Sequence, residues 1–264
     1  MTTRADLLLV ERGLAASRTA AQHLIEAGRV FVLDAGRRVA VGKASQKLFA
    51  DIEFDIVPDE ADRYVSRGGL KMAGALAQAG LDVRGLIVLD LGISTGGFTD
   101  CLLQVGAARV IGVDVGHSQL APKLTADPRV VLLEGVNARH LHADDIAAHT
   151  GATGVDLVVI DVSFISLELV LPAAAALIRP GGHLLSLVKP QFEVGREGLG
   201  KGGIVKNERL FDTVRDKIVA LCERLELSVL DYFDSPIKGG DGNREFFVFA
   251  RCDAAPAGTL AQPV

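Results

Sequence analysis

The chain has no tryptophan, few aromatic residues and no long apolar run, and these shortages exclude several classes of protein. Only 5% of its residues are aromatic, so a core must be built mainly from Leu, Val, Ile and Ala. The longest apolar stretch, residues 167–178, is interrupted by Glu168 and Pro172 and is shorter than the roughly 20 residues that span a bilayer. Residues 1–6 are charged and contain no apolar signal core. The sequence therefore predicts a cytoplasmic protein with no membrane partner.

Cysteine is also scarce. The three cysteines lie far apart and form no C-x-x-C pair, so neither a disulfide framework nor a cysteine-based metal site is expected. His140, His142 and His149 fall in a polar segment that reads as surface, and no metal is predicted there. The net charge of −5 argues against a wholly basic surface, although a local basic face can still bind RNA.

The first 58 residues predict a small α+β domain. A first helix is expected to end at Gly13, Ser17 is a good N-cap for a second helix, and Gly28 is a good C-cap. Short strands are expected over 30–32 and 52–57. The predicted organisation is a domain at 1–58, a polar linker at 59–65, a larger domain at 66–252 and a flexible tail at 253–264.

In the larger domain, apolar strand patterns alternate with helical patterns. This alternation predicts a mostly parallel sheet with helices on both faces. The last strand follows a glycine-rich turn, and a hairpin there makes it antiparallel. The fold class is therefore α/β: a Rossmann-like, seven-stranded sheet beside the small α+β domain. The expected strands are 86–90, 109–114, 130–133, 156–160, 183–188, 228–233 and 245–250, and the clearest helices are 70–79, 98–105, 166–178 and 207–226.

The glycine-rich stretch at 90–98 carries the strongest chemical signal. It places an acid at a strand end, a glycine-rich turn and a helix start together, which is typical of a pocket for a nucleoside-bearing cofactor. Glycines there let the backbone pass close to a ligand. Their G-x-x-x-G-G spacing disfavours a nicotinamide enzyme, whose motif is G-x-G-x-x-G. An acid at this position can face a methionine-like amino group, which points to S-adenosylmethionine. The expected cofactor residues are Asp90, Gly92, Ser94, Thr95, Gly96, Gly97 and Phe98.

Two later positions extend this predicted pocket. Asp114 ends the strand at 109–114, where its carboxylate can accept hydrogen bonds from both ribose hydroxyls. The alternative is an ordinary helix N-cap, but the position one βα unit after the glycine loop favours the ribose role. Asn137 follows the third strand and can either line an adenine pocket or form a turn, and the sequence does not separate these alternatives.

Four ionisable residues are expected to gather at the carboxyl edge of the sheet. Asp161 and Lys189 end the fourth and fifth strands, and a lysine that ends an apolar strand is costly unless it is paired or functional. Glu245 begins the last strand, which reaches the same edge if it is antiparallel, and Lys71 lies on a helix that can fold over that edge. Each can be an ordinary solvated charge, but together they form a site whose ionisation can be tuned.

These four residues match the Lys-Asp-Lys-Glu tetrad of FtsJ-type ribose 2′-O-methyltransferases. From about residue 4 to 251 the chain resembles the TlyA (haemolysin A) family of rRNA methyltransferases. The longer matching segments are Val65–Lys71, Ser94–Thr99, Asp161–Leu167 and Val188–Gly195. In the first domain, Gly13-Leu14, Ser17-Arg18 and Gly28-Arg29-Val30 resemble the αL RNA-binding motif.

The resemblance implies S-adenosylmethionine as methyl donor and a cytidine ribose 2′-hydroxyl in rRNA as acceptor. The partner would be ribosomal RNA or a ribosomal subunit, and the protein would be a monomer or a homodimer. Lys71, Asp161, Lys189 and Glu245 would be catalytic. Lys189 would either deprotonate the hydroxyl, for which it must be neutral, or only steer it, while the two acids hold the ammonium groups. Phe164 would stack on a flipped nucleotide or cover the pocket floor.

RNA binding is expected from arginines, with ordinary surface charge as the alternative. Residues 1–60 hold eight Lys/Arg against nine Asp/Glu, so a basic face there must be local. Phosphate contacts give affinity but no base readout. A second alternative, a membrane-active haemolysin, needs an amphipathic or apolar segment, and none of sufficient length occurs. The arginines expected to contact phosphate are Arg4, Arg12, Arg18, Arg29 and Arg67.

Overall fold

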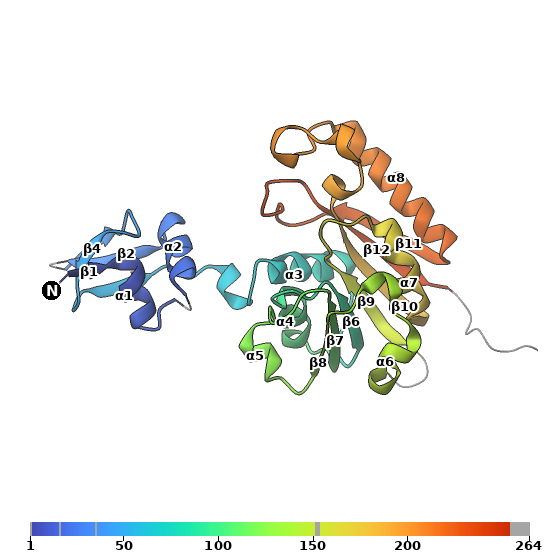
Figure 1. Cartoon of the computed structure of the whole chain (residues 1–264), viewed down its shortest axis with the longest axis horizontal. Coiled ribbons are helices and arrows are strands. Elements are labelled where there is room, and N and C mark those ends of the chain that lie inside the picture. The colour runs from blue at the N-terminus through green and yellow to red at the C-terminus, as the bar shows by residue number, and fades with distance from the viewer. Residues whose placement is uncertain (1, 16, 35, 151–153, 254–264) are drawn as a thin grey trace, which may run out of the picture. The chain divides into compact units, whose positions relative to one another are not determined.

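A computed structural model describes residues 2–15, 17–34, 36–150 and 154–253. The chain divides into two compact units, Met1–Asp62 and Arg63–Val264 (Figure 1). The division falls inside the segment 59–65 that the sequence predicts as a linker. Of the predicted tail, only Asp253 lies among the described residues.

The N-terminal unit packs two helices against two small antiparallel sheets, one formed by β1 and β4 and the other by β3, β2 and β5. Ser17 caps α2 as predicted, because its side-chain oxygen accepts a hydrogen bond of 3.2 Å from the Ala20 amide. Leu9 and Val30 are fully buried in this unit's own core. The elements are β1 (Thr2–Arg4), α1 (Ala5–Glu11), α2 (Arg18–Glu26), β2 (Val30–Asp34), β3 (Arg37–Ala40), β4 (Lys47–Phe49) and β5 (Glu53–Ile56), followed by the 3-10 helix η1 (Glu60–Arg63).

The second unit is built on a seven-stranded sheet with the order β11-β12-β10-β9-β6-β7-β8. Neighbouring strands from β8 to β10 in this order run parallel, whereas β12 runs antiparallel to both β10 and β11. The predicted Rossmann-like sheet with an antiparallel last strand is therefore confirmed. The strands are β6 (Ile87–Leu91), β7 (Arg109–Asp114), β8 (Val130–Glu134), β9 (Val155–Ile160), β10 (Ile178–Val188), β11 (Leu227–Asp234) and β12 (Phe246–Cys252).

Helices cover both faces of this sheet. The prediction of one helix over 166–178 is wrong at both ends: a separate 3-10 turn precedes α7, Pro172 lies in the first turn of α7, and Ile178 already pairs with Val155 in the sheet. The helices are α3 (Gly68–Ala79), α4 (Gly97–Gln104), α5 (Pro122–Thr125), α6 (Ala143–Thr150), α7 (Leu171–Ala176) and α8 (Glu208–Arg224), with 3-10 helices η2 (Ala138–His140), η3 (Leu167–Leu169), η4 (Pro190–Phe192), η5 (Arg196–Gly198) and η6 (Lys201–Gly203).

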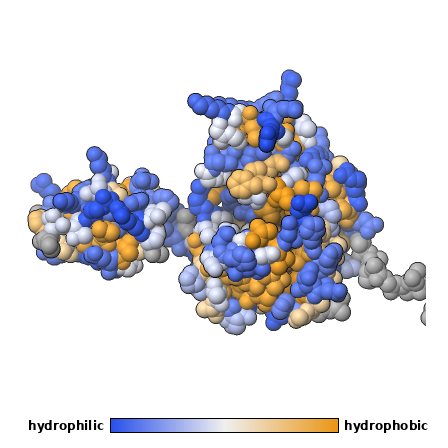
Figure 2. Space-filling model, viewed as in Figure 1, coloured by the Kyte–Doolittle hydropathy of each residue, from blue (hydrophilic) through white to orange (hydrophobic). Residues whose placement is uncertain are grey.

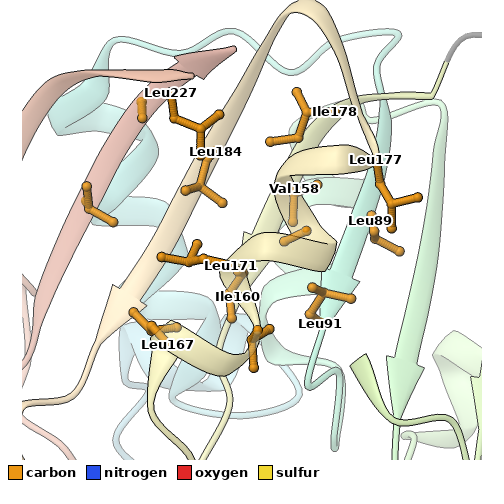
Figure 3. Close-up of a cluster of buried hydrophobic side chains, with 14 of the residues drawn as sticks. Leu89, Leu91, Val158, Ile160, Leu167, Leu171, Leu177, Ile178, Leu184 and Leu227 are labelled. Carbon is orange, nitrogen blue, oxygen red and sulfur yellow. The ribbon is translucent and has the colours of Figure 1, made fainter. Parts of the chain in front are cut away.

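Alternate residues of the central strands enter different cores. Leu89 and Val158 pack with residues of α6, α7 and α8 on one face, whereas Val88 and Leu157 pack with α3 and α4 on the other. Figure 3 shows Leu89 and Val158 in the first of these cores, with Leu171 of α7. This period of two is what a sheet buried on both faces requires. Because β6, β7, β9 and β10 are parallel, their carboxyl ends meet at one edge of the sheet.

Apolar surface is also present on the outside of this unit. On the face shown in Figure 2 it gathers near the middle of the second unit, with hydrophilic residues around it. Phe164 is the most exposed large apolar side chain among the described residues, with 91% of its surface accessible. Phe164 lies in the segment that directly follows β9, next to the candidate site.

Candidate active site

Two ion pairs lie at the carboxyl edge of the sheet, and they contain all four residues of the predicted tetrad. Lys71 Nζ is 2.6 Å from Glu245 Oε2, and Lys189 Nζ is 2.7 Å from Asp161 Oδ1. Lys189 Nζ also donates a hydrogen bond of 2.8 Å to Ser163 Oγ. The four side chains that the sequence places far apart are therefore brought together.

Sheet register explains this gathering. Asp161 directly follows β9, and Lys189 directly follows β10. The antiparallel pair β10–β12 aligns Val188 with Phe246, so Glu245 enters the sheet beside Lys189. Lys71 reaches the same place from the second turn of α3, which covers this part of the sheet.

The Lys71–Glu245 pair is deeply buried, since Lys71 is 8% exposed and Glu245 is 4% exposed. Removing one partner of such a pair leaves an uncompensated charge away from water, which typically costs about 3–5 kcal/mol. Each of these two side chains is therefore needed to hold the other in place. The pair formed by Lys189 and Asp161 is more open to the cavities next to it.

Two cavities meet at these ion pairs. A cavity of about 250 Å³, here called the glycine-loop cavity, is lined by the loop after β6, by the start of α3 and by Asp161. A second one of about 490 Å³, here called the aromatic cavity, is lined by Phe164, Phe192 and Glu245 among others. The residues that line both are Lys71, Ser163, Lys189 and Gly240.

The glycine loop takes the conformation that its sequence suggests, but for a reason the sequence did not reveal. Gly92 and Gly96 have φ angles of +84° and +91°, which only glycine adopts readily. A Cβ at Gly92 would lie 2.6 Å from the Asp161 carbonyl oxygen, and one at Gly97 would lie 2.3 Å from Ser66 Oγ. The surrounding protein thus requires these glycines, and a close approach of the backbone to a ligand stays a prediction.

Gly97 provides a test of this packing. We expect Gly97→Ala to lower the free energy of unfolding by about 1–3 kcal/mol, because the new methyl group would also meet the backbone of Gly68 at 3.0 Å. Gly240→Ala is the matched control, since a Cβ there meets nothing within 4 Å. Denaturant unfolding of both variants measures the difference, and equal stabilities would contradict the packing argument.

Asp90 lies behind the loop rather than on the cavity wall. It is 1% exposed, and its Oδ2 accepts a hydrogen bond of 2.6 Å from Thr99 Oγ1. Its Oδ1 has no hydrogen-bond partner among the described residues. Burial raises the pKa of Asp90 to about 7, with repulsion from Asp161 and Asp114 adding to the effect. The site thus holds a carboxyl group that a nearby cation would ionise.

Asp114 and Asn137 have different local roles. Asp114 accepts hydrogen bonds from the Ser94 amide at 2.9 Å and the Gly116 amide at 2.8 Å, so it ties the glycine loop to the end of β7. It caps no helix, so the alternative of an N-cap is wrong, and its ribose role stays a prediction. Asn137 accepts a hydrogen bond of 3.1 Å from the Arg139 amide and caps η2, which confirms its turn-forming role and leaves an adenine contact as a prediction.

Two of the predicted phosphate ligands are tied to a buried acid. Arg4 and Arg18 lie 2.8 Å and 2.9 Å from Asp6 Oδ2, and Asp6 is fully buried. The guanidinium of Arg4, assisted by that of Arg18, holds the pKa of Asp6 well below its usual range. Both arginines therefore stabilise the N-terminal unit, and only their outer edges are free for phosphate.

The other three arginines also have protein partners. Arg12 donates to the carbonyls of residues 50 and 52, and Arg29 pairs with Asp62. Arg67 lines the glycine-loop cavity, and its guanidinium donates a hydrogen bond of 3.0 Å to the Lys238 carbonyl. Arg67 belongs to the same unit as the tetrad and lines a cavity with Lys71, Asp161 and Lys189, and phosphate binding by all five arginines stays a prediction.

Some residues at the cavities are not predicted by the sequence. Ser163 and Gln191 stand inside the matching segments 161–167 and 188–195, yet nothing in their type marked them. Asp241 belongs to the glycine-rich turn before the last strand and lines the aromatic cavity, and Asn243 of the same turn donates a hydrogen bond to it. A polar residue between glycines next to a catalytic strand is the signal that could have found them.

The site fits S-adenosylmethionine in chemical type. Carboxylates end β6, β7 and β9, and Asp90 keeps an unpartnered buried oxygen. Acceptors of this kind suit a ligand that carries a sulfonium, an ammonium and ribose hydroxyls. In the described ranges no group of three or more His, Cys, Asp or Glu is arranged to hold a metal ion, and no helix is long and apolar enough to cross a membrane.

Comparisons with known proteins agree with this chemistry. Residues 64–252 match the model of the FtsJ-like methyltransferase family. The chain is 42% identical to the 16S/23S rRNA (cytidine-2′-O)-methyltransferase TlyA of Mycobacterium tuberculosis, over 94% of this chain and 89% of that protein. It is 35% identical to Hemolysin A of Brachyspira hyodysenteriae, over 92% of this chain and 97% of that protein. A solved structure from Streptococcus thermophilus that carries a hemolysin name is 40% identical, with a TM-score of 0.73 and coverage of 97% of this chain and 90% of that chain.

Proposed function

The chain belongs to the FtsJ-like methyltransferase family, and we propose that it transfers a methyl group from S-adenosylmethionine to the 2′-hydroxyl of a cytidine ribose in ribosomal RNA. The observation that carries this proposal is the pair of Lys–acid ion pairs at the meeting point of two cavities. Such a junction is where a donor and an acceptor from opposite sides can exchange a group. The partner would be rRNA, free or in a ribosomal subunit, in the cytoplasm.

The cofactor would lie in the glycine-loop cavity. Ser94, Thr95 and Phe98 line that cavity, and Asp114 and Asp90 lie at the neighbouring strand ends. When bound, the sulfonium supplies an electrophilic methyl group. The protein's own contribution is to hold that end of the ligand against the ion pairs and to keep the loop in one conformation through the Ser94–Asp114 hydrogen bond.

The acceptor hydroxyl would approach Lys189 from the aromatic cavity. Lys189 Nζ is held at two points, by Asp161 and by Ser163, so its remaining N–H direction is fixed. In this position it can orient the hydroxyl for in-line attack or take its proton, and alignment alone accounts for several kcal/mol of the barrier. Lys71 and Glu245 would fix the wall against which the ribose packs.

Phe164 would stack on the base of the acceptor nucleotide. Its ring is 5.2 Å from the ring of Phe192, both line the aromatic cavity, and its φ of +64° is unusual for a bulky residue. An exposed aromatic ring at a cavity mouth, carried by a residue with a strained backbone, suits stacking on a flipped nucleotide. The exposure of Phe164 argues against the alternative that it covers the pocket floor.

We expect Phe164→Ala to weaken RNA recognition without weakening the fold. Base stacking on an aromatic side chain is worth about 1–3 kcal/mol, so the KM for RNA should rise by roughly 5- to 100-fold. The thermal midpoint should change little, because the side chain that is removed is exposed. Steady-state methylation with RNA as the varied substrate measures this, and Leu230→Ala, another exposed apolar side chain, serves as the control.

The function can be tested by ligand binding and by product mapping. S-adenosylmethionine or S-adenosylhomocysteine should raise the thermal midpoint of the protein, whereas NAD should not. Ribosomes from cells that lack the gene should then accept a labelled methyl group at a cytidine 2′-hydroxyl when the protein is added. Stabilisation by NAD instead would favour a nicotinamide enzyme. Leakage of liposomes at moderate protein concentration would favour a membrane-active haemolysin.

A further inference from the structure

We infer that Asp241, held in place by Gln191 and Asn243, reads the 4-amino group of the acceptor base and so selects cytidine over uridine. This inference rests on the proposed function and names the base-selective contact of the same site. Asp241 lines the aromatic cavity together with Lys71, Lys189 and Glu245. It is exposed to that cavity, so a base that enters can reach it.

The neighbours of Asp241 fix the direction of its carboxylate. Gln191 Nε2 donates to Asp241 Oδ2 at 3.2 Å, and Asn243 Nδ2 donates to the same oxygen at 2.9 Å. The backbone amide of Asn243 donates a hydrogen bond of 3.0 Å to Asp241 Oδ1. These contacts also fix the Gln191 amide, because a carboxylate can only accept, so the Nε2 side must face Asp241.

Asn243 anchors this arrangement in the fold. It is 1% exposed, its Oδ1 accepts a hydrogen bond of 2.9 Å from the Val205 amide, and its Nδ2 also donates to the Gly203 carbonyl at 3.1 Å. The turn that carries Asp241 is thereby joined to η6 and to Val205 just after it, and Gly202 and Gly203 of η6 form another part of the cavity wall. A contact meant to discriminate must be rigid in this way.

This part of the wall offers hydrogen-bond acceptors rather than donors. The side-chain donors of Gln191 and Asn243 already point at Asp241, and Gln191 Oε1 is buried without a partner among the described residues. A carboxylate has no proton to give, and each of its oxygens can accept more than one hydrogen bond. The carboxylate of Asp241 can therefore satisfy an amino group but not a carbonyl oxygen.

Asp241 also lies close to the tetrad. A Cβ built on Gly239 would be 2.6 Å from Glu245 Oε1 and 2.8 Å from Asp241 Oδ1, so the two carboxylates are near neighbours on either side of this glycine. One nucleotide can thus present its ribose to Lys189 while its base edge faces Asp241, with Phe164 against the ring.

Cytosine and uracil differ at position 4 of the ring, where a hydrogen-bond acceptor such as Asp241 can distinguish them. Cytosine carries an amino group at position 4, a donor that Asp and Glu accept from, whereas uracil carries an oxygen that would face the carboxylate. A site that hydrogen-bonds a polar group discriminates more strongly against an analogue that lacks the group than a site that selects by shape. We expect a preference for cytidine of roughly 10- to 100-fold from this contact.

The experiment compares RNAs that carry one of three nucleosides at the mapped position. These are cytidine, uridine and the riboside of pyrimidin-2-one, which has a hydrogen atom in place of the 4-amino group of cytidine. Methylation by the wild-type protein should be slower on the uridine RNA and on the pyrimidin-2-one RNA than on the cytidine RNA. Asp241→Asn should lower the ratio of kcat/KM for cytidine to kcat/KM for uridine by at least 10-fold, because an amide can rotate to donate a hydrogen bond to the uracil oxygen. Asp234→Asn makes the same chemical change at an exposed site paired with Arg244 and should leave the ratio unchanged.

Gln191→Met supplies a second variant, because it removes the amide that orients Asp241 but keeps an apolar side chain of similar length. Gln191→Met should lower the cytidine-to-uridine ratio of kcat/KM less than Asp241→Asn does. If Gln191 had a purely structural role, the variant would methylate cytidine and uridine more slowly by the same factor, and the ratio would stay unchanged. A wild-type protein that methylates cytidine and uridine equally, or an Asp241→Asn protein with the wild-type ratio, would overturn the inference alone. A wild-type protein that methylates no RNA would overturn the proposed function, and the inference with it.

Discussion

Replacement of Lys189 by Ala should reduce single-turnover methyl transfer by roughly 100- to 10,000-fold while binding of S-adenosylmethionine changes little. Lys189 Nζ is held by Asp161 Oδ1 at 2.7 Å and by Ser163 Oγ at 2.8 Å, at the junction of the two cavities. Without this ammonium group the acceptor hydroxyl would lose its orienting or deprotonating partner.

Two measurements on Lys189→Ala separate a chemical role from a structural one. Rapid-quench methylation with saturating RNA reports the chemical step, and a thermal shift with S-adenosylhomocysteine reports cofactor binding. Lys206→Ala removes an exposed ammonium group of the same unit that lines neither cavity, and it should keep its activity. If Lys189→Ala transferred methyl groups at the rate of Lys206→Ala, the assignment of Lys189 to the reaction would be wrong.

Lys189→Arg distinguishes the two mechanisms that the site allows. An arginine keeps the positive charge and can pair with Asp161, but it does not lose its proton in proteins. If Lys189 only steers the hydroxyl, the Arg variant should retain more activity than the Ala variant by at least 10-fold. If Lys189 takes the proton, the two variants should be equally slow.

The sequence predicts the sheet and the tetrad well because both depend on strand ends. Asp161 and Lys189 could be assigned to one edge from the strand pattern alone, since parallel strands finish on the same side. Glu245 required only the further prediction that the last strand is antiparallel, and the register of Val188 with Phe246 bears this out. The sequence also predicts that the two acids hold the two ammonium groups, but which acid pairs with which lysine depends on where α3 lies against the sheet.

Packing against other parts of the chain explains most of what the sequence did not show. The glycines of the loop were assigned to a ligand, yet Gly97 is also required by Ser66 and Gly96 by Leu124, contacts that join residues about 30 positions apart. Arg4 and Arg18 were assigned to phosphate, yet both pair with Asp6 inside the first unit. A residue type indicates which chemistry is possible, but the partner it takes is decided by tertiary contacts.

Replacement of Asp90 by Asn should stabilise the free protein and weaken its binding of S-adenosylmethionine. Burial raises the pKa of Asp90 to about 7, whereas the unfolded chain has the ordinary value of 3.8. Between these values the folded state binds more protons than the unfolded state, so the free energy of unfolding falls as pH rises from about 4 to about 7 and levels off above that. The full cost of the ionised, buried group is about 4 kcal/mol.

Asn cannot ionise, so the Asp90→Asn protein should lack this part of the pH dependence. At pH 8 its thermal midpoint should exceed that of the wild type by several degrees, while at pH 4 the two should agree. Asp234→Asn, at an exposed site, should change the free energy of unfolding by less than about 0.5 kcal/mol at either pH. Denaturant unfolding at a series of pH values measures these differences.

The affinity for the cofactor should change with pH in the opposite direction to the free energy of unfolding. This difference distinguishes an acid that binds the cofactor from one that is buried without a function. A cation bound beside Asp90 favours the ionised form, so the affinity of the wild-type protein for S-adenosylmethionine should rise between pH 6 and 8. In Asp90→Asn this rise should be absent and the affinity at pH 8 should be lower. A variant that is more stable and binds the cofactor as tightly as the wild type at every pH would show that the buried charge serves neither the fold nor the cofactor, and Asp90 would have to be removed from the site.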